Sequence, residues 1–525
     1  MTRPPGAETV DYVVVGAGAT GSVVANRLSR DADTRVLMLE AGGPDTDPRI
    51  SPVDALVQTW GSELDWALLT EPQPGMDGRQ ILINQGKVVG GSTSIHAMMW
   101  VRGHRSNFDA WRDGGGDGWG FDDVLEFFTT IEDYDGGASR YRGAGGPVRV
   151  RTCPDPAARS DAFMRAATEL GYDGPAWDYN GERQENGAGP LQFTIDDDGA
   201  RVSAASAYLH PVRERANLTI RTGAAASRLI VEGSRVVGVE YRQAGEAKRV
   251  FAEREVIVSA GAFMSPKLLM LSGIGPADAL RAHGIDVVLD LPGVGQNLQD
   301  HLQLPVAFRS LVDAPSPGLL TGNVLFVDTR RASGTHAPDL QLNFTPSVPR
   351  PLAGVIDLGG PGCIFLPILV QPASVGEVRL RSADPDDAPV IDPRYLSDEA
   401  DVAVFREALR LIRELSGTEA LGAVVGPELA PGTDADESGY IRSQTATLWH
   451  PAGTCRMGSR GDMGAVVDPE LRVHGLESLR VADASVMPRV PSGNTQAACF
   501  MIGEKLAHMM LGAEDRDGAT RRNPR

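Results

Sequence analysis

A glycine-rich turn near the start of the chain constrains its fold more than any other feature. The turn, GAGATG at residues 16–21, follows the apolar run VDYVVV and precedes a stretch with helical spacing. A second apolar run, RVLMLE, comes next and ends at Glu40. Strand, turn, helix and strand in this order predict a βαβ unit that binds a dinucleotide, with the pyrophosphate at the helix N-terminus.

Each glycine of the turn has a physical role in such a site. Gly16 permits the tight turn, Gly18 lets the backbone approach a pyrophosphate, and Gly21 lets the helix pack closely on the strand. Glu40 would accept hydrogen bonds from ribose hydroxyls, and its charge would repel a 2′-phosphate. This motif by itself leaves FAD and NAD both open.

The length and composition indicate two domains, or one large domain with an insertion. The chain has 525 residues, of which 42% are hydrophobic and 23% charged, as in ordinary globular proteins with a sizeable core. Its net charge of −19 argues against binding to nucleic acid or an anionic membrane surface, because both select basic patches.

Cysteine usage and hydropathy favour a soluble, cytoplasmic protein. The four cysteines are scattered without metal-like spacing, so we expect reduced thiols and no metal site. No apolar run reaches the roughly 18 residues of a membrane span. The first residues, MTRPPGAETV, lack the apolar stretch of a secretion signal.

Apolar periodicity suggests how the rest of the chain is organised. Helices are expected around residues 160–170 and over 398–416, where apolar residues share one helical face. The last residues, 512–525, lack such periodicity and are expected to form a disordered tail. Between about 300 and 385, β-like runs separated by little helix favour antiparallel pairing: LPVAFRSL, NVLFVDTR, DLQLNF, CIFLPILV and GEVRLRS.

Two later stretches favour FAD over a diffusing nucleotide. GKVVGGSTS, residues 86–94, is a second loop suited to close backbone approach to a flat or phosphorylated ligand. Near the C-terminus Asp483 ends a strand, and Asn494 is expected to cap a long apolar helix. Two helix ends and two glycine loops suit a long, permanently held cofactor.

Together these stretches resemble a known family, the glucose–methanol–choline (GMC) family of FAD-dependent oxidoreductases. The resemblance covers nearly the whole length. It is carried by VVVGAGATGSVVANRLS, GKVVGGSTSIHAMMWVRG, VIVSAGAFMSPKLLMLSGIGP, VGQNLQDH, GEVRLRSADPDDAPVIDPRYL, HPAGTCRMG and VVDPELRVHGLESLRVADASVMP running into GNTQAA.

The resemblance implies an α/β fold with two domains. One is a Rossmann-like FAD-binding domain, discontinuous in sequence, expected over 1–155, 200–300 and 445–525. The other is a substrate-binding domain with an antiparallel sheet, expected over 156–199 and 301–444.

The family also implies a reaction and a set of cofactor contacts. The reaction is oxidation of an alcohol to a carbonyl by hydride transfer to flavin N5, with O2 or another acceptor taking the electrons. The implied cofactor-binding residues are Gly16, Gly18, Thr20, Gly21, Glu40, Gly91, Ser92, His96, Ala97, Met98, Ala226, Asp483, Ala484, Asn494, Thr495 and Gln496, with Ala226 in the loosest motif.

His450, in TLWHPAGTCRMG, is the predicted catalytic base. Removing a hydride from an alcohol requires that the hydroxyl proton also leave, and a neutral imidazole can accept it. Asn494 can hold the same oxygen without titrating, and a His–Asn pair in these two motifs is one of the family's usual pairings. A buried structural histidine is the alternative. A metal site would need more ligands than Cys455 nearby.

The chain departs from the family pattern beside the second glycine loop. Some members tether FAD through a histidine at the position that is Ile95 here, so we predict FAD bound without a covalent link. His96, where most members carry Asn, is expected to hydrogen bond near the flavin, with a tether through His96 as the alternative. Trp449 and Trp66 are candidates for the substrate pocket.

Other functions on the same scaffold remain open at this point. A flavin-containing lyase, similar to hydroxynitrile lyases, would use the histidine as an acid–base group, and a light-driven fatty-acid decarboxylase is a rarer alternative. His301 and His474 are interpreted as structural. No charge cluster identifies the substrate, and nothing indicates the oligomeric state.

Overall fold

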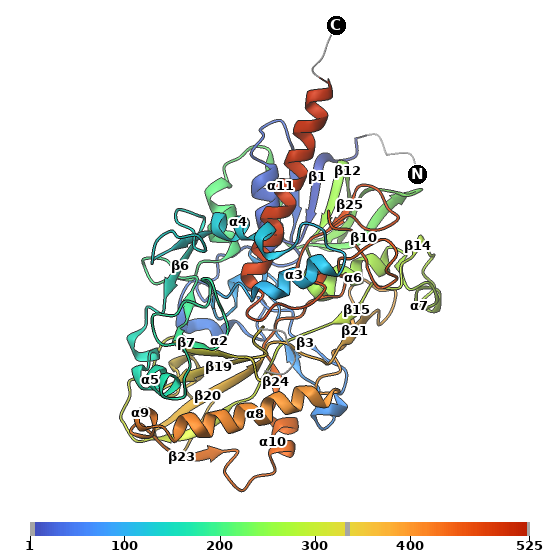
Figure 1. Ribbon diagram of the computed structural model, residues 1–525. Coiled ribbons are helices and arrows are strands. Elements are labelled where there is room, and N and C mark those ends of the chain that lie inside the picture. The colour runs from blue at the N-terminus through green and yellow to red at the C-terminus, as the bar shows by residue number, and fades with distance from the viewer. Residues whose placement is uncertain (1–5, 331–336, 522–525) are drawn as a thin grey trace.

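The computed structural model describes residues 6–330 and 337–521. Two large sheets dominate it, one in the upper and one in the lower half of Figure 1, and the chain passes between them several times. The predicted α/β fold, with a nucleotide-binding part and an antiparallel part, is confirmed.

The first sheet has the order β10-β11-β12-β1-β2-β9, with β25 paired to β12. Its centre is parallel, and β10, β11 and the first half of β12 form an antiparallel meander. The strands are β1 (Thr9–Val15), β2 (Val36–Leu39), β9 (Leu218–Arg221), β10 (Ala224–Glu232), β11 (Arg235–Gln243), β12 (Glu246–Val258) and β25 (Leu479–Val481). Because the central strands are buried on both faces, they read as continuous apolar runs.

Two helices from opposite ends of the chain pack beside this sheet. These are α1 (Ala19–Leu28) and α11 (Gln496–Arg521), which lie side by side in Figure 1. Gly503 permits the close approach, because a Cβ there would lie 2.8 Å from the Cβ of Val23. The end of the chain is therefore tied to the nucleotide-binding turn at its beginning.

The second sheet is antiparallel, with the order β23-β17-β20-β19-β18-β7 and two short additions, β16 and β24. Helix α8 (Glu399–Ser416) lies across it in Figure 1, and the predicted face of Val402, Phe405, Leu409 and Ile412 is buried. The strands are β7 (Gly187–Pro190), β16 (Leu302–Gln303), β17 (Val306–Ser310), β18 (Asn323–Val327), β19 (Leu340–Thr345), β20 (Gly362–Leu369), β23 (Val425–Ala430) and β24 (Ala446–Thr447).

Four of the five predicted β runs form neighbouring strands of this sheet, namely β17, β18, β19 and β20. The fifth run forms β21 (Gly376–Arg379), which pairs instead with β15 (Gln296–Leu298) and β22 (Val390–Asp392). The two sheets draw their strands from the two sets of segments that the sequence suggested, except that β24 belongs to the second sheet. We keep the domain division as a proposal on this basis.

Smaller elements complete the fold. The helix expected around 160–170 is α5 (Asp161–Glu169). The other helices are α2 (Leu56–Thr59), α3 (Arg105–Asp113), α4 (Phe121–Ile131), α6 (Gly261–Leu271), α7 (Ala277–Ala282), α9 (Glu419–Gly422) and α10 (Glu437–Gln444). The remaining short strands are β3 (Leu68–Leu69), β4 (Leu82–Ile83), β5 (Glu132–Tyr134), β6 (Val148–Thr152), β8 (Gln192–Phe193), β13 (Ile274–Gly275) and β14 (Leu289–Asp290).

Helix α11 differs from the expected end of the chain. It continues to Arg521, through much of the region from 512 where a disordered tail was predicted. Adding residues to an existing helix avoids the unfavourable nucleation step, so a segment without an apolar face can still extend one. Residues 522–525 lie outside the described part.

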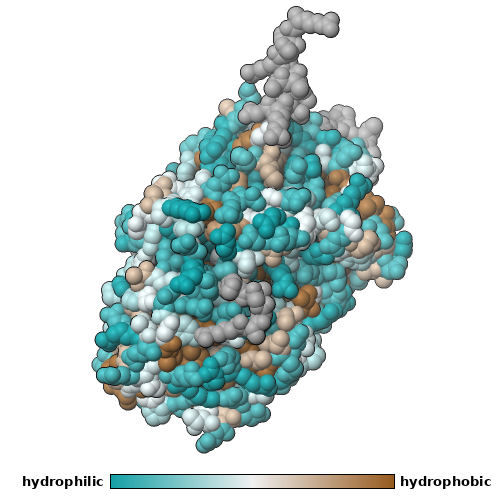
Figure 2. All heavy atoms as spheres, in the orientation of Figure 1, coloured by the Kyte–Doolittle hydropathy of each residue, from teal (hydrophilic) through white to brown (hydrophobic). Residues whose placement is uncertain are grey.

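The exterior is mostly hydrophilic. Figure 2 shows polar side chains over most of one face, with apolar ones in small groups. Within the described residues, no helix is both long and apolar enough to cross a membrane.

Candidate active site

A cavity of about 1110 Å³ extends from the carboxyl ends of the parallel strands to the second sheet. Ligands of open α/β sheets bind at such strand ends. Every residue predicted for cofactor, catalysis or pocket lines this cavity except Gly21, which lies behind the turn. Residues from opposite ends of the sequence thus meet around one space.

Close contacts require two of the three glycines of the first turn. Gly16 has φ +103°, and a Cβ there would lie 2.4 Å from the carbonyl oxygen of Ser259. A Cβ on Gly21 would lie 2.1 Å from the carbonyl oxygen of Gly16. Gly18 differs, because a Cβ there would meet nothing within 4 Å and would project into open space. The backbone at Gly18 is therefore bare where a pyrophosphate would approach.

Glu40 is buried at the end of β2 and is held by the backbone. Its carboxylate accepts the N–H of Ala17 at 2.9 Å and that of Gly42 at 2.8 Å. Burial raises the pKa of Glu40, and these N–H donors oppose the rise. The carboxylate is thereby fixed where a ribose would lie in a dinucleotide site.

The second glycine loop closes against the first. A Cβ on Gly91 would lie 2.8 Å from the Cα of Gly18, so the second loop can approach the first this closely only with glycine at position 91. Ser92, Ala97 and Met98 follow along the cavity wall, and Met98 has φ +62°. This wall is the one that the family resemblance assigned to the flavin.

His96 is buried beside Arg201. Its Nδ1 accepts the Met98 N–H at 3.2 Å and lies 2.9 Å from a guanidinium nitrogen of Arg201. Burial, followed by the charge of Arg201, lowers the pKa of His96 to about 3. His96 is therefore a neutral group on the cavity wall. Ile95 is buried and packs in a small cluster with Val88.

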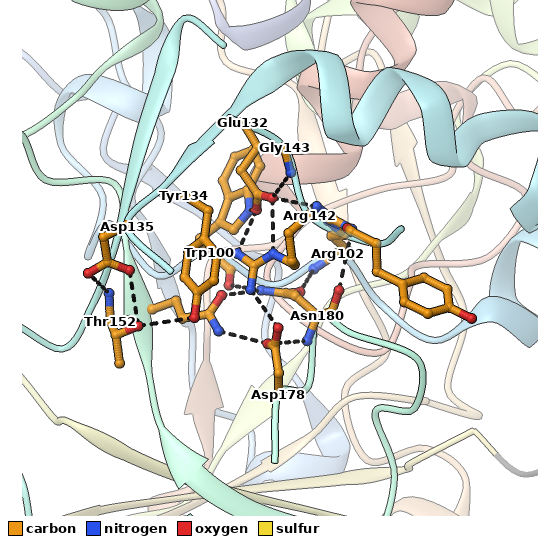
Figure 3. Close-up of polar contacts among 12 residues, drawn as sticks. Trp100, Arg102, Glu132, Tyr134, Asp135, Arg142, Gly143, Thr152, Asp178 and Asn180 are labelled. Atoms are coloured by element: carbon orange, nitrogen blue, oxygen red, sulfur yellow. Dashed lines mark hydrogen bonds and ion pairs between the residues drawn. The ribbon is translucent and has the colours of Figure 1, made fainter. Parts of the chain in front are cut away.

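A buried charge network holds the segment that follows this loop (Figure 3). Glu132 accepts hydrogen bonds from Trp100 at 2.8 Å, from Arg102 at 2.6 Å and from Arg142 at 2.8 Å. Arg142 also donates to Asp178 at 2.8 Å. Burial alone would raise the pKa of Glu132, but the two arginines outweigh burial and lower it. The network fixes the chain just beyond Met98 while staying outside the cavity.

The C-terminal motifs supply the opposite wall. Asp483 accepts the N–H of Gly261 at 2.8 Å, the N–H of Ser485 at 2.7 Å and the hydroxyl of Ser265 at 2.6 Å, so its orientation is set. Helix α11 begins just beyond Thr495, whose carbonyl accepts the N–H of Cys499 at 3.0 Å. Thr495 rather than Asn494 therefore occupies the N-cap, which leaves the Asn494 side chain for another contact.

The residues at this end of the cavity fit FAD. Helix α1 has no side-chain cap at its N-terminus, where Gly18 is the N-cap residue, so its first N–H groups are left free to bind an anion. Ala226 lines the same end, and Gln496 lies at the start of α11. The space continues between the second glycine loop and α11, where a flat ring system can lie.

His450 contacts two partners across the cavity wall. Its Nε2 lies 3.2 Å from Nδ2 of Asn494, and its Nδ1 lies 3.0 Å from Nδ1 of His301. The backbone N–H of His450 donates to Asp300 at 2.7 Å. Because the Asn494 amide donates to Nε2, a neutral His450 carries its proton on Nδ1 and donates it to His301.

Burial sets the charge state of this group. It lowers the pKa of His450 to about 3, so the imidazole is neutral at ordinary pH. Burial and the neighbouring His450 also hold the pKa of His301 well below its usual value. Burial raises the pKa of Asp300 to about 6, although Thr447 and Tyr395 donate to its carboxylate. A neutral imidazole with a lone pair at Nε2 can accept a proton.

Aromatic rings flank the histidine. Trp449 has φ +62°, and its ring centroid lies 4.7 Å from that of Trp60. Trp66 also lines the cavity, and Nζ of Lys87 lies 4.5 Å from the centroid of its ring. Both predicted tryptophans therefore reach the cavity.

Sequence reasoning missed several residues of the site. His301 was interpreted as structural, yet it contacts His450, and Trp60 and Arg201 drew no notice. The NLQDH motif was the one available signal for Asp300 and His301. His474 lies elsewhere, with Nε2 at 3.1 Å from the Gly458 carbonyl oxygen. Among the described residues, no group of three or more His, Cys, Asp or Glu side chains could hold a metal ion.

Comparison with known proteins gives consistent matches along the chain. Residues 10–303 match the family model for the N-terminal part of GMC oxidoreductase, and residues 372–503 match that for the C-terminal part. An oxygen-dependent choline dehydrogenase of Brucella anthropi is 40% identical over 529 aligned positions, covering 96% of this chain and 95% of that protein.

Solved structures are similar over the same extent. Pyridoxine 4-oxidase from Mesorbium loti has a TM-score of 0.88 and 37% identity, covering 95% of this chain and 99% of that one. An Aspergillus oryzae formate oxidase structure that concerns FAD modification has a TM-score of 0.87 and 30% identity, covering 97% of this chain and 99% of that one.

Proposed function

The chain belongs to the GMC oxidoreductase family of FAD-dependent enzymes, and on that premise we propose that it oxidises an alcohol to a carbonyl, with His450 as base and Asn494 as its partner. The observation that carries the proposal is the pair itself. His450 and Asn494 lie 3.2 Å apart on the cavity wall, and burial keeps the imidazole neutral.

The chemistry divides between the cofactor and the chain. FAD, when bound, would supply the acceptor for the hydride that leaves the alcohol carbon. His450 accepts the hydroxyl proton at Nε2, which the contacts with Asn494 and His301 keep unprotonated; the alcohol hydroxyl takes the place of the Asn494 N–H at this lone pair. Asn494 can orient the substrate oxygen by donating to it from Nδ2, whose amide group carries two N–H donors and contacts His450 at 3.2 Å. Both groups are neutral, so neither requires a charged substrate.

We further propose that FAD is held without a covalent link. Gly16, Gly18 and the α1 N-terminus would hold the pyrophosphate, and Glu40 the ribose hydroxyls. Ile95 stands at the position from which some family members tether the cofactor and cannot form such a bond. Denaturing the purified protein and separating it from small molecules tests this, because yellow colour left on the protein would contradict it.

The names of the similar proteins favour oxidation over the lyase and decarboxylase alternatives. They include an oxygen-dependent choline dehydrogenase and a pyridoxine 4-oxidase. We therefore propose a small-molecule alcohol as the substrate, and O2 or another electron acceptor as the second partner. Admitting air after anaerobic reduction distinguishes them, since rapid recolouring with peroxide formation identifies an oxidase.

The experiment that tests the base is anaerobic reduction of the flavin by substrate. His450→Ala should slow reduction by roughly 10²–10⁴-fold, the usual worth of general-base assistance, while FAD stays bound. His210→Ala is the matched control, because His210 is about half exposed, pairs with Asp45 and lies outside the cavity. A His450→Ala variant that reduces its flavin at the wild-type rate would exclude the assignment.

A further inference from the structure

We propose that the site takes an uncharged alcohol that has an apolar body and a second oxygen, rather than an alcohol with a quaternary ammonium group. This inference rests on the proposed alcohol oxidation and names the class of substrate for the same cavity.

The second sheet forms an uncharged wall opposite the nucleotide end. Alternation along β19 buries Leu340, Leu342 and Phe344 in the core that α8 covers, and turns Asn343 and Thr345 to the cavity. Along β20, Ile364 and Leu366 face the same space, and Gln303, Pro305 and Leu448 complete the wall. None of these side chains carries a charge.

The acidic side chains of the lining all have partners away from this wall. Glu40 and Asp483 accept backbone N–H groups at the ends of first-sheet strands. Asp386 is ion-paired with Arg242 of β11, a first-sheet strand. The described lining therefore offers no carboxylate on this wall that could balance a fixed positive charge in a buried substrate. Asp300 lies beside His450 but outside the lining, and it accepts hydrogen bonds from Thr447, Tyr395 and the His450 backbone.

Positive charge already occupies part of the aromatic surface. Lys87 lies over the ring of Trp66 at 4.5 Å, so that ring already contacts one cation. Trp60 and Trp449 pack against each other with centroids 4.7 Å apart, which occupies part of the surface of each ring. Cation–π attraction at what remains exposed is modest unless the cation is desolvated among several rings. These tryptophans are therefore better suited to contact an apolar group of the substrate than an ammonium group.

An unpaired amide marks where a second substrate oxygen would bind. Asn343 is 1% exposed, and its Oδ1 accepts the Nε2 of Gln341 at 3.1 Å. Its Nδ2 has no hydrogen-bond partner in the described part of the chain, although buried donors are nearly always paired. Asn343 lines the cavity while Nδ2 itself is covered, so a hydroxyl, ether or carbonyl oxygen of the substrate pairs with it once the side chain turns toward the cavity, whereas a quaternary ammonium group has no lone pair.

An apolar segment borders the same part of the cavity. Pro349, Leu352, Val355 and Ile356 all line it, and Val355 is 68% exposed. A substrate that enters past these residues loses its hydration water against apolar side chains. Such a path favours a neutral molecule, because removing water from a charged group is costly. The name of the Brucella anthropi relative would predict choline here, and the lining of this cavity argues against it.

The test is anaerobic reduction of the FAD-loaded enzyme by matched alcohols. Choline and 3,3-dimethylbutan-1-ol have the same shape and differ in charge. The dependence of the reduction rate on alcohol concentration gives the ratio of limiting rate to apparent Kd. This ratio should be higher for the neutral alcohol than for choline by roughly tenfold or more. Preference for choline would overturn the inference while leaving alcohol oxidation in place.

A second series tests the second oxygen. Hexan-1-ol is compared with 2-propoxyethanol, 3-ethoxypropan-1-ol and 4-methoxybutan-1-ol, which keep its length and move one ether oxygen along it. At least one ether should be preferred over hexan-1-ol by roughly fivefold or more, and Asn343→Leu should remove that preference. Equal use of all four by the wild type would refute a role for Asn343.

Failure of the proposed substrate class and failure of the proposed alcohol oxidation give different results. If no alcohol in either series reduces the flavin although a chemical reductant does, the proposed oxidation fails together with the substrate class. The wild-type comparisons do not depend on the variant, so poor folding of Asn343→Leu would leave them valid. A melting temperature for the variant near that of the wild type shows that its selectivity can be interpreted.

Discussion

Replacing His301 by leucine tests the contact that sequence reasoning missed. In the wild type, Nδ1 of His450 donates to Nδ1 of His301 at 3.0 Å, which keeps Nε2 unprotonated so that it can take the substrate proton. Leucine fills similar space but accepts no hydrogen bond. His450 must then either bury an unpaired N–H or move its proton to Nε2, where it can no longer act as a base.

The lost hydrogen bond sets the expected loss of reduction rate in His301→Leu. A buried donor that loses its partner costs about 1–3 kcal/mol. Because about 1.36 kcal/mol corresponds to a tenfold change in rate, His301→Leu should slow flavin reduction by roughly 5- to 150-fold. His301→Gln keeps an acceptor oxygen in the side chain and should stay within roughly fivefold of the wild type.

The assay is stopped-flow measurement of flavin reduction under anaerobic conditions, at alcohol concentrations that rise to saturation. A residue that acts through His450 should lower the limiting rate and leave the apparent Kd unchanged, since His301 is buried behind the imidazole. The solvent deuterium isotope effect on reduction should rise, because proton removal becomes more rate-limiting.

Two results would refute this reasoning. One is a wild-type limiting rate in His301→Leu, which would mean that the tautomer of His450 does not depend on His301. The other is equal slowing by His301→Leu and His301→Gln, which would indicate loss of packing instead of loss of an acceptor.

Three further predictions follow from the same contacts. Burial lowers the pKa of His450 to about 3, and a base is active above its pKa, so the limiting reduction rate should be flat from about pH 7 to 9, above the pKa of about 6 of the neighbouring Asp300; half-loss at pH 7 or above would contradict this. Glu132→Gln leaves Arg102 and Arg142 buried without their shared carboxylate and should lower the free energy of unfolding by about 3–5 kcal/mol in urea titrations, whereas Asp133→Asn, which breaks a partly exposed pair with Arg149, should cost about 1 kcal/mol or less. Asn343→Asp places a carboxylate on the uncharged wall and should shift selectivity toward choline by roughly tenfold relative to 3,3-dimethylbutan-1-ol. The measurement is made at about pH 8 so that a buried carboxyl is ionised, and the absence of a shift would argue that this wall does not contact the substrate.

Local features of the sequence predicted the glycine turn of the first βαβ unit. The spacing of Gly16, Gly18 and Gly21 and the acidic Glu40 encode a turn whose geometry depends on near neighbours, so pattern reasoning reached it directly. The apolar face of α8 could also be predicted from the sequence, because helix periodicity is a local property. The C-terminal end of α11 could not be predicted in this way, since apolar spacing does not indicate where a helix stops once it has been nucleated.

The sequence by itself determined which chemical groups are present: a dinucleotide turn, a histidine and an asparagine in two C-terminal motifs, and strands with alternating faces. The tertiary structure alone decided which of these groups meet. Antiparallel pairing of β16 with β24 places Leu302 opposite Thr447, and this register brings His301 to His450 across 149 residues of sequence. The same kind of long-range register turns Asn343 to the cavity and Leu342 to the core. A one-residue shift would reverse those faces, and the energy that prevents it comes from packing against α8, which no local pattern contains.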